Sequence, residues 1–182
     1  MANAAAGAGL ALLMSGDREG AEEWLGRAHD VYRASWQDAP PGSWGRAIAM
    51  LKARILIGDW SGAEEDAHWT LEQTAAASGS PIGRYAACLA LLTLRRWEQA
   101  RVLADGLRTR EDFPEPVGDA LAMIAADDPL GYTEAIESVL ESFETREEYL
   151  EDVPVADTVL VLQALAGRRD LTVELSSPLL PS

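Results

Sequence analysis

Residues 56–63 read Leu56-Ile57-Gly58-Asp59-Trp60-Ser61-Gly62-Ala63, in which an apolar stretch precedes a Gly-Asp turn and a start rich in small residues. This signature is repeated at residues 14–21, which read Met14-Ser15-Gly16-Asp17-Arg18-Glu19-Gly20-Ala21. Weaker copies lie at residues 94–100 and 127–135. The four copies end on alanines separated by 42, 37 and 35 residues, namely Ala21, Ala63, Ala100 and Ala135. Repeats of this length are typical of stacked helical hairpins, because one hairpin is too small to bury its own apolar face.

Helix-breaking residues mark the limits of the hairpins. Prolines interrupt the helical pattern at residues 40 and 41, open a helix at Pro81, and break the chain again near Pro114 and Pro154. We therefore expect hairpins at about 3–35, 43–77, 81–110 and 117–150, and a capping helix and tail at 154–182. All lie in a single helical-repeat domain, 1–182. The predicted fold class is all-α, a stack of four to five antiparallel helical hairpins with an extended C-terminal tail.

The repeated signature resembles the tetratricopeptide repeat family. In that family a small residue follows the turn, and further small or apolar residues follow four and seven positions later. The matching residues here are Ala21, Leu25 and Ala28; Ala63, Ala67 and Thr70; Ala100, Ala104 and Leu107; and Ala135, Val139 and Ser142. The resemblance implies a right-handed superhelix that binds peptides on its inner face. Arg95-Arg96 replaces Gly-Asp in the third copy, and the intervals exceed the family's 34 residues, so we expect a tetratricopeptide-like stack and not a regular array.

The C-terminal third carries a second resemblance. It is similar to the closing part of an all-helical family of bacterial toxin-immunity proteins, the forty-ninth such family. The similar segments are residues 132–141, the apolar stretch 160–166 and residues 173–181. Such proteins neutralise a cognate toxin by covering its active site. The resemblance covers about 50 residues and brings no catalytic residue with it.

Charge limits the classes of partner. The chain has 30 acidic and 15 basic residues, a formal net charge of −15 at pH 7. Nucleic acids and anionic membranes require positive potential, so neither is expected as a ligand, and a basic protein partner is favoured. Arg supplies every basic residue except Lys52, a composition typical of a GC-rich bacterial genome. The single Cys88 fits a reducing cytoplasm, and the apolar residues 4–14 are too short to span a bilayer, so we expect a cytoplasmic protein.

No residue pattern typical of catalysis, cofactor binding or metal binding occurs in the chain. His29 and His68 have no second His or Cys at zinc-ligand spacing, and we interpret both as surface or half-buried helix residues. Cys88 lies in an apolar run and is interpreted as a buried structural thiol. We therefore expect no enzyme activity, no cofactor and no metal, although an enzyme with a site formed from scattered groove residues stays an alternative.

Two surfaces are candidates for partner binding. The first is the inner face made by the first helices of the hairpins, with Trp44, Lys52, Arg84 and Tyr85 as an aromatic and cationic rim that would accept a peptide carboxylate. The same face would carry Asn3, Leu10, Ile48 and Leu89. The alternative is that Trp44 and Tyr85 only pack between repeats.

The second candidate is an acidic docking face on the long helix near the C-terminus. Its carboxylates recur three or four residues apart and are Glu137, Glu141, Glu144 and Glu148. They would attract a basic partner, and the alternative is a solvated outer face without a partner. The sequence thus favours a non-catalytic module that binds a peptide or protein. An immunity protein is the alternative function, and an exposed repeat end would allow a homodimer.

Overall fold

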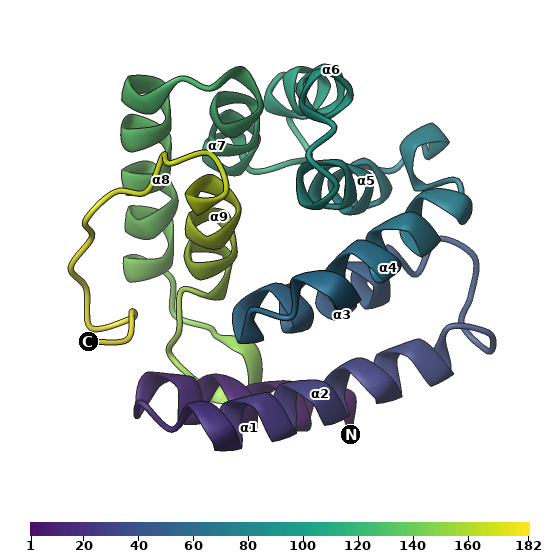
Figure 1. Cartoon of the computed structure of the whole chain (residues 1–182), viewed down its shortest axis with the longest axis vertical. Helices are drawn as coiled ribbons and strands as arrows, with labels where there is room; N and C mark the ends of the chain where they lie inside the picture. The colour runs from purple at the N-terminus through teal and green to yellow at the C-terminus, as the bar shows by residue number, and fades with distance from the viewer.

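A computed structural model describes all 182 residues and is all-helical (Figure 1). The α-helices are α1 (Ala2–Met14), α2 (Arg18–Ser35), α3 (Trp44–Ile57), α4 (Trp60–Glu72), α5 (Pro81–Thr93), α6 (Trp97–Arg108), α7 (Glu115–Ala126), α8 (Pro129–Glu144) and α9 (Asp157–Gly167). Two short 3-10 helices, η1 (Ala75–Ala77) and η2 (Leu150–Asp152), lie between them. The prediction of an all-α fold is confirmed. The helices predicted to run to Ala77 and Leu150 end earlier, at Glu72 and Glu144.

The turns that follow α1, α3, α5 and α7 share one backbone geometry. Each contains a residue in the left-handed region, with φ of 82° at Gly16, 75° at Gly58, 58° at Arg95 and 60° at Asp127. The amide of the next residue donates to the carbonyl five residues earlier, at 2.9–3.1 Å in each case. This is the Schellman arrangement, which satisfies helix-end carbonyls while the chain reverses. Arg95-Arg96 therefore makes the same turn as the Gly-Asp pairs.

A carboxylate opens the next helix in three of the four turns. The side chains of Asp17, Asp59 and Asp128 accept hydrogen bonds of 2.9–3.0 Å from the backbone amides of Gly20, Gly62 and Gly131. These bonds satisfy amides that have no partner within the helix. The aspartate in the repeated signature is thus an N-cap, and its role is to start each second helix.

The four alanines of the signature are buried, with exposed fractions of 0–7%. The fourth copy is nevertheless shifted in register. The amide of Tyr132 bonds the carbonyl of the N-cap Asp128, as Ala21 does to Asp17 and Ala63 does to Asp59. Tyr132 therefore takes the position that alanine takes elsewhere, and Ala135 lies three residues further on. The larger side chain is accommodated because its hydroxyl donates to Gln163 of α9 at 2.9 Å.

Consecutive helices pack against one another, and the chain curves so that α9 lies within the arc (Figure 1). α9 contacts α3, α7 and α8. The main core cluster extends from Leu51 to Leu179 and contains no residue of α1 or α2. Those two helices pack onto α3 through a small separate cluster that comprises Ala5, Ala28, Tyr32 and Met50. The interface between the first helix pair and the rest is therefore less continuously packed than the main core.

Two consecutive arginines fasten the end of α9 to the other turns. Arg168 donates to the carbonyl of Thr93 at 2.6 Å and to Glu64 at 2.9 Å, and its guanidinium lies 4.3 Å from the centre of the Trp60 ring. Arg169 donates to the last carbonyls of α7 and lies 4.5 Å from the Trp97 ring. We refer to Arg168 and Arg169 as the arginine clamp. It ties α9 to the ends of α5 and α7 and to the starts of α4 and α6.

Candidate partner-binding site

Three cavities adjoin one another where α1, α2 and α3 face the segment that joins α8 to α9. Their volumes are about 60, 520 and 300 Å³, and all three are lined by Leu150 and Asp157. We refer to them together as the inner cavity. It lies at the discontinuity between the first helix pair and the main core, where apolar packing is incomplete.

The inner cavity has an apolar floor and a polar rim. The floor is lined by small and aliphatic side chains of α1, α2 and α3, among them Leu10, Ala28 and Ala49. On the rim, the Tyr32 hydroxyl donates to Asn3 at 2.6 Å. Arg46 donates to the carbonyl of Ser35 at 3.0 Å and forms no ion pair. A pocket of this kind, mostly apolar with a few polar groups at its edge, is the usual form of a binding site.

Lys52 lies at the junction of floor and rim and is held by α9. Its ammonium donates to Asp157 and to Thr158, both at 2.9 Å. Burial alone would lower the pKa of Lys52, but the Asp157 carboxylate outweighs this effect and the pKa lies above its usual value. Tyr85, from α5, is buried close to this pair, its hydroxyl has no hydrogen-bond partner, and burial raises its pKa.

The four residues proposed as an inner rim have different environments. Lys52 lines the inner cavity, whereas Tyr85 is buried with its ring 5.4 Å from that of Phe113. Trp44 is buried against Ala47 and Ala75, and its ring lies 5.5 Å from that of Trp36. Arg84 donates to the carbonyl of Ser78 at 3.0 Å. Asn3, Leu10 and Ile48, which were assigned to the same face, also line the inner cavity.

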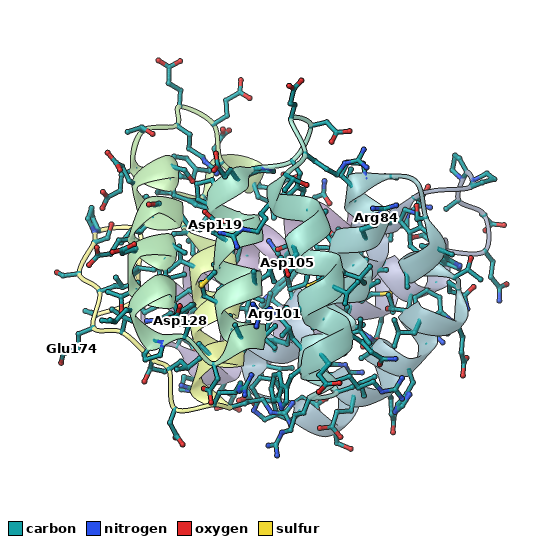
Figure 2. The ribbon with its side chains drawn as sticks, turned by 90° about the horizontal axis from the view of Figure 1, so that it is seen from above. Arg84, Arg101, Asp105, Asp119, Asp128 and Glu174 are labelled. Atoms are coloured by element: carbon teal, nitrogen blue, oxygen red, sulfur yellow. The ribbon has the colours of Figure 1, made fainter.

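Arg84 lines none of the three parts of the inner cavity, and Figure 2 shows it among charged residues on another face of the molecule. On this face Asp105 bridges Arg101 at 3.7 Å and Arg108 at 3.8 Å, and Arg108 bonds Asp119 of α7 at 2.6 Å. The charges here are largely paired with one another, so this face offers less net charge to a partner.

The acidic face differs from this paired surface. Glu137, Glu141 and Glu144 on α8 and Glu148 beyond it are all exposed, and none of them forms an ion pair. The one polar contact is from the Ser177 hydroxyl, which donates to Glu144 at 2.7 Å. The carboxylates are therefore available to a cationic surface.

His29 differs from the expectation that both histidines are surface or half-buried residues. It is 6% exposed, and its Nε2 lies 2.7 Å from the Asp66 carboxylate of α4 and its Nδ1 3.0 Å from that of Asp30. Burial would lower the pKa of His29, but the hydrogen bonds to both carboxylates outweigh it, and the pKa lies above the usual value. Arg54 lies 3.6 Å from the same Asp66 carboxylate. His68, by contrast, is exposed.

Sequence reasoning missed Tyr32, Leu150 and Asp157 as cavity residues. Tyr32 lies on a helix that was predicted, but its direction toward the cavity depends on how α2 and α3 cross. Leu150 and Asp157 reach the first helices of the chain only because the chain returns to them after more than 100 residues. No short-range pattern signals such a return.

Comparison with known proteins identified no matching family model and no curated protein or solved structure with significant similarity. None of the helices combines the length and apolar character needed to cross a membrane. No group of three or more His, Cys, Asp or Glu side chains is placed to hold a metal ion. The structure is that of an all-helical protein with a cavity, partly open to solvent, between its first helix pair and the start of α9.

Proposed function

We propose that this protein is a non-catalytic interaction module that binds a peptide or protein segment in the inner cavity. In this proposal the helices form a tetratricopeptide-like right-handed superhelix, with α1, α3, α5 and α7 as the inner helices of four hairpins. α9 acts as the inner helix of an incomplete fifth unit. The turn after α9 supports this assignment, since Asp170 has φ of 58° and the next amide bonds the carbonyl of Ala166 at 3.1 Å, as in the four preceding turns.

The observation that carries the proposal is the inner cavity itself. Its apolar floor would accept an aliphatic side chain, and its rim offers an unpaired guanidinium at Arg46 and hydrogen-bonding groups at Asn3 and Tyr32. A partner would gain free energy from burying apolar surface there, because the main core does not extend to this interface.

The acidic face favours one particular version of this function. Unpaired carboxylates on α8, with the net charge of −15, would accelerate encounter with a basic partner. An immunity protein that covers a basic, nucleic-acid-processing toxin has this electrostatic character and is the second candidate. Charge reversal by Glu137→Lys and Glu141→Lys would then slow association and reduce its dependence on salt.

Panning of a random 12-residue peptide library tests the proposal, followed by calorimetric titration of the selected peptides. Ala49→Leu places extra carbons in the cavity, and Ala34→Leu, at an exposed site on α2, is the matched control. We expect Ala49→Leu to weaken binding at least tenfold and Ala34→Leu to change it less than twofold. Failure to select any peptide, or equal effects of the two variants, would contradict binding in the inner cavity.

A further inference from the structure

The segment that joins α8 to α9 crosses the first helix of the chain. In Figure 1 it descends from α8 to α1, which η2 contacts, and rises to α9. We refer to residues 147–154 as the strap. It contains η2 and presents Leu150 to all three parts of the inner cavity, although this side chain is 41% exposed. An exposed leucine at the edge of an apolar cavity covers it only in part.

The strap has few attachments to the helices beneath it. Its backbone hydrogen bonds are internal, from Asp152 to Tyr149, from Val153 to Leu150 and from Val155 to Val153. The Tyr149 hydroxyl donates to the carbonyl of Phe143 at 2.7 Å, which anchors the strap to α8. No hydrogen bond or ion pair joins the strap to α1, α2 or α3. It is held on the first repeats by van der Waals contact alone.

One feature makes the closed strap costly in free energy. Glu151 and Asp152 are consecutive non-glycine residues in the left-handed region, with φ of 51° and 58°, a conformation that L-residues adopt with strain. The strap also carries four exposed carboxylates that form no ion pair, namely Glu147, Glu148, Glu151 and Asp152.

The strap lies directly over the polar rim. The Glu151 charge contributes to the raised pKa of Tyr32, second to burial, which places this carboxylate near the Tyr32 hydroxyl. The Cβ of Glu151 also lies against Gly7 of α1, where a methyl group added to the glycine would come within 2.9 Å of it. Gly7 thus allows the closed position, because any larger residue would press on the strap.

We propose that the strap is a displaceable cover, in which Leu150 occupies the mouth of the inner cavity until an apolar side chain of a partner replaces it. This regulation rests on the proposed function, since it acts on the same cavity. The strained backbone lowers the stability of the closed state, so that a partner has to supply less free energy to open it. A basic partner would in addition neutralise the strap carboxylates as it docks.

Hydrogen exchange measured by NMR without any partner tests whether the strap opens. We expect the amides of Asp152, Val153 and Val155 to exchange at least tenfold faster than those of Leu51 and Leu89 in the core. Gly7→Ala should accelerate strap exchange about tenfold further. Gly26→Ala is the matched control, because it also replaces a helical glycine but has no atom within 4 Å of the added carbon. Glu151→Gly relieves the left-handed strain and should slow exchange about threefold or more.

Binding of the dye anilinonaphthalene sulfonate tests whether opening uncovers the cavity. We expect Gly7→Ala to increase dye fluorescence several-fold over Gly26→Ala, and Ala49→Leu added to Gly7→Ala to remove most of the increase. Strap amides that exchange no faster than the core, or equal dye binding by Gly7→Ala and Gly26→Ala, would overturn the proposal. Because neither measurement needs the partner, a failure to find a peptide would contradict the proposed function and leave this result standing.

Discussion

Replacing Arg168 tests how the arginine clamp closes the molecule around α9. The Arg168 side chain is 11% exposed and bonds both a backbone carbonyl of α5 and a carboxylate of α4. Arg168→Ala removes these bonds and the stacking on Trp60 together. We expect α9 to lose a main attachment to the earlier helices, so that the whole chain becomes less stable.

The size of the effect follows from the individual contacts. A buried charge-assisted hydrogen bond such as that to Thr93 contributes about 2 kcal/mol, and cation–π stacking on Trp60 contributes about 1 kcal/mol. The ion pair adds less than about 1 kcal/mol, since the Glu64 side chain is 46% exposed and its charge is screened by water. The expected loss is about 3 kcal/mol in the free energy of unfolding, or roughly 6–12 °C in Tm for a chain of this size.

Arg27→Ala is the matched control for this substitution. Arg27 also pairs with a glutamate and lies over a tryptophan ring, at 4.8 Å from the centre of Trp24, but its side chain is 57% exposed. We expect it to cost less than about 1 kcal/mol. Urea unfolding followed by circular dichroism gives both values. Equal losses for Arg168→Ala and Arg27→Ala would refute the argument that burial makes the clamp strong.

Three further predictions concern single side chains. Because the pKa of His29 is raised in the folded protein, the His29 contribution to the free energy of unfolding is complete below about pH 6.5 and is lost as the pH rises through the folded pKa. His29→Gln should therefore remove this pH dependence from the urea midpoint of unfolding. An unchanged pH dependence would contradict the role given to His29. Burial raises the pKa of Cys88 to about 12, so native protein at pH 8 should react with Ellman's reagent only as fast as it unfolds, and rapid labelling would disprove this. Arg95→Gly should stabilise the chain by about 1 kcal/mol and Gly58→Ala should destabilise it by a similar amount, because the backbone is left-handed at both positions. Thermal unfolding measures both changes. Tm shifts of the same sign for the two variants would exclude backbone conformation as their cause.

Much of the secondary structure was predictable because its signals are local. The second hairpin was predicted to begin at about residue 43, after the prolines at 40 and 41, and α3 does begin at Trp44. The end of α4 was misplaced because residues 73–77 contain no proline or glycine, yet Thr74 adopts a left-handed conformation that ends the helix. Such a conformation at a β-branched residue is rare, and a sequence pattern does not indicate it.

The third and fourth repeats show where the pattern itself was misleading. Arg95 makes the same left-handed turn as Gly16 and Gly58, so the geometry persists where the glycine signal is lost. In the fourth repeat, alignment on Ala135 gave an interval of 35 residues, whereas the backbone places Tyr132 at that position. A tyrosine fits there because α9 supplies a hydrogen-bond partner at Gln163, a contact that no nearby residue in the sequence reveals.

Lys52 illustrates the same limit at the candidate site. Its position on the inner side of α3 was predicted from the repeat, and it does line the inner cavity. Its partners Asp157 and Thr158 lie more than 100 residues away along the chain. No pattern in the sequence indicated that α9 would hold this lysine.

Local signals along the chain were sufficient to specify helices, caps, left-handed turns and a strongly acidic surface, because each depends on residues within about one helical turn of one another. The inner cavity, the strap above it and the arginine clamp arose only from the way the helices stack. The angles at which successive helices pack decide whether the C-terminal residues reach the first helices of the chain. That long-range closure brings Leu150, Asp157 and Arg168 to partners far away in sequence, where their chemistry becomes available to a binding site.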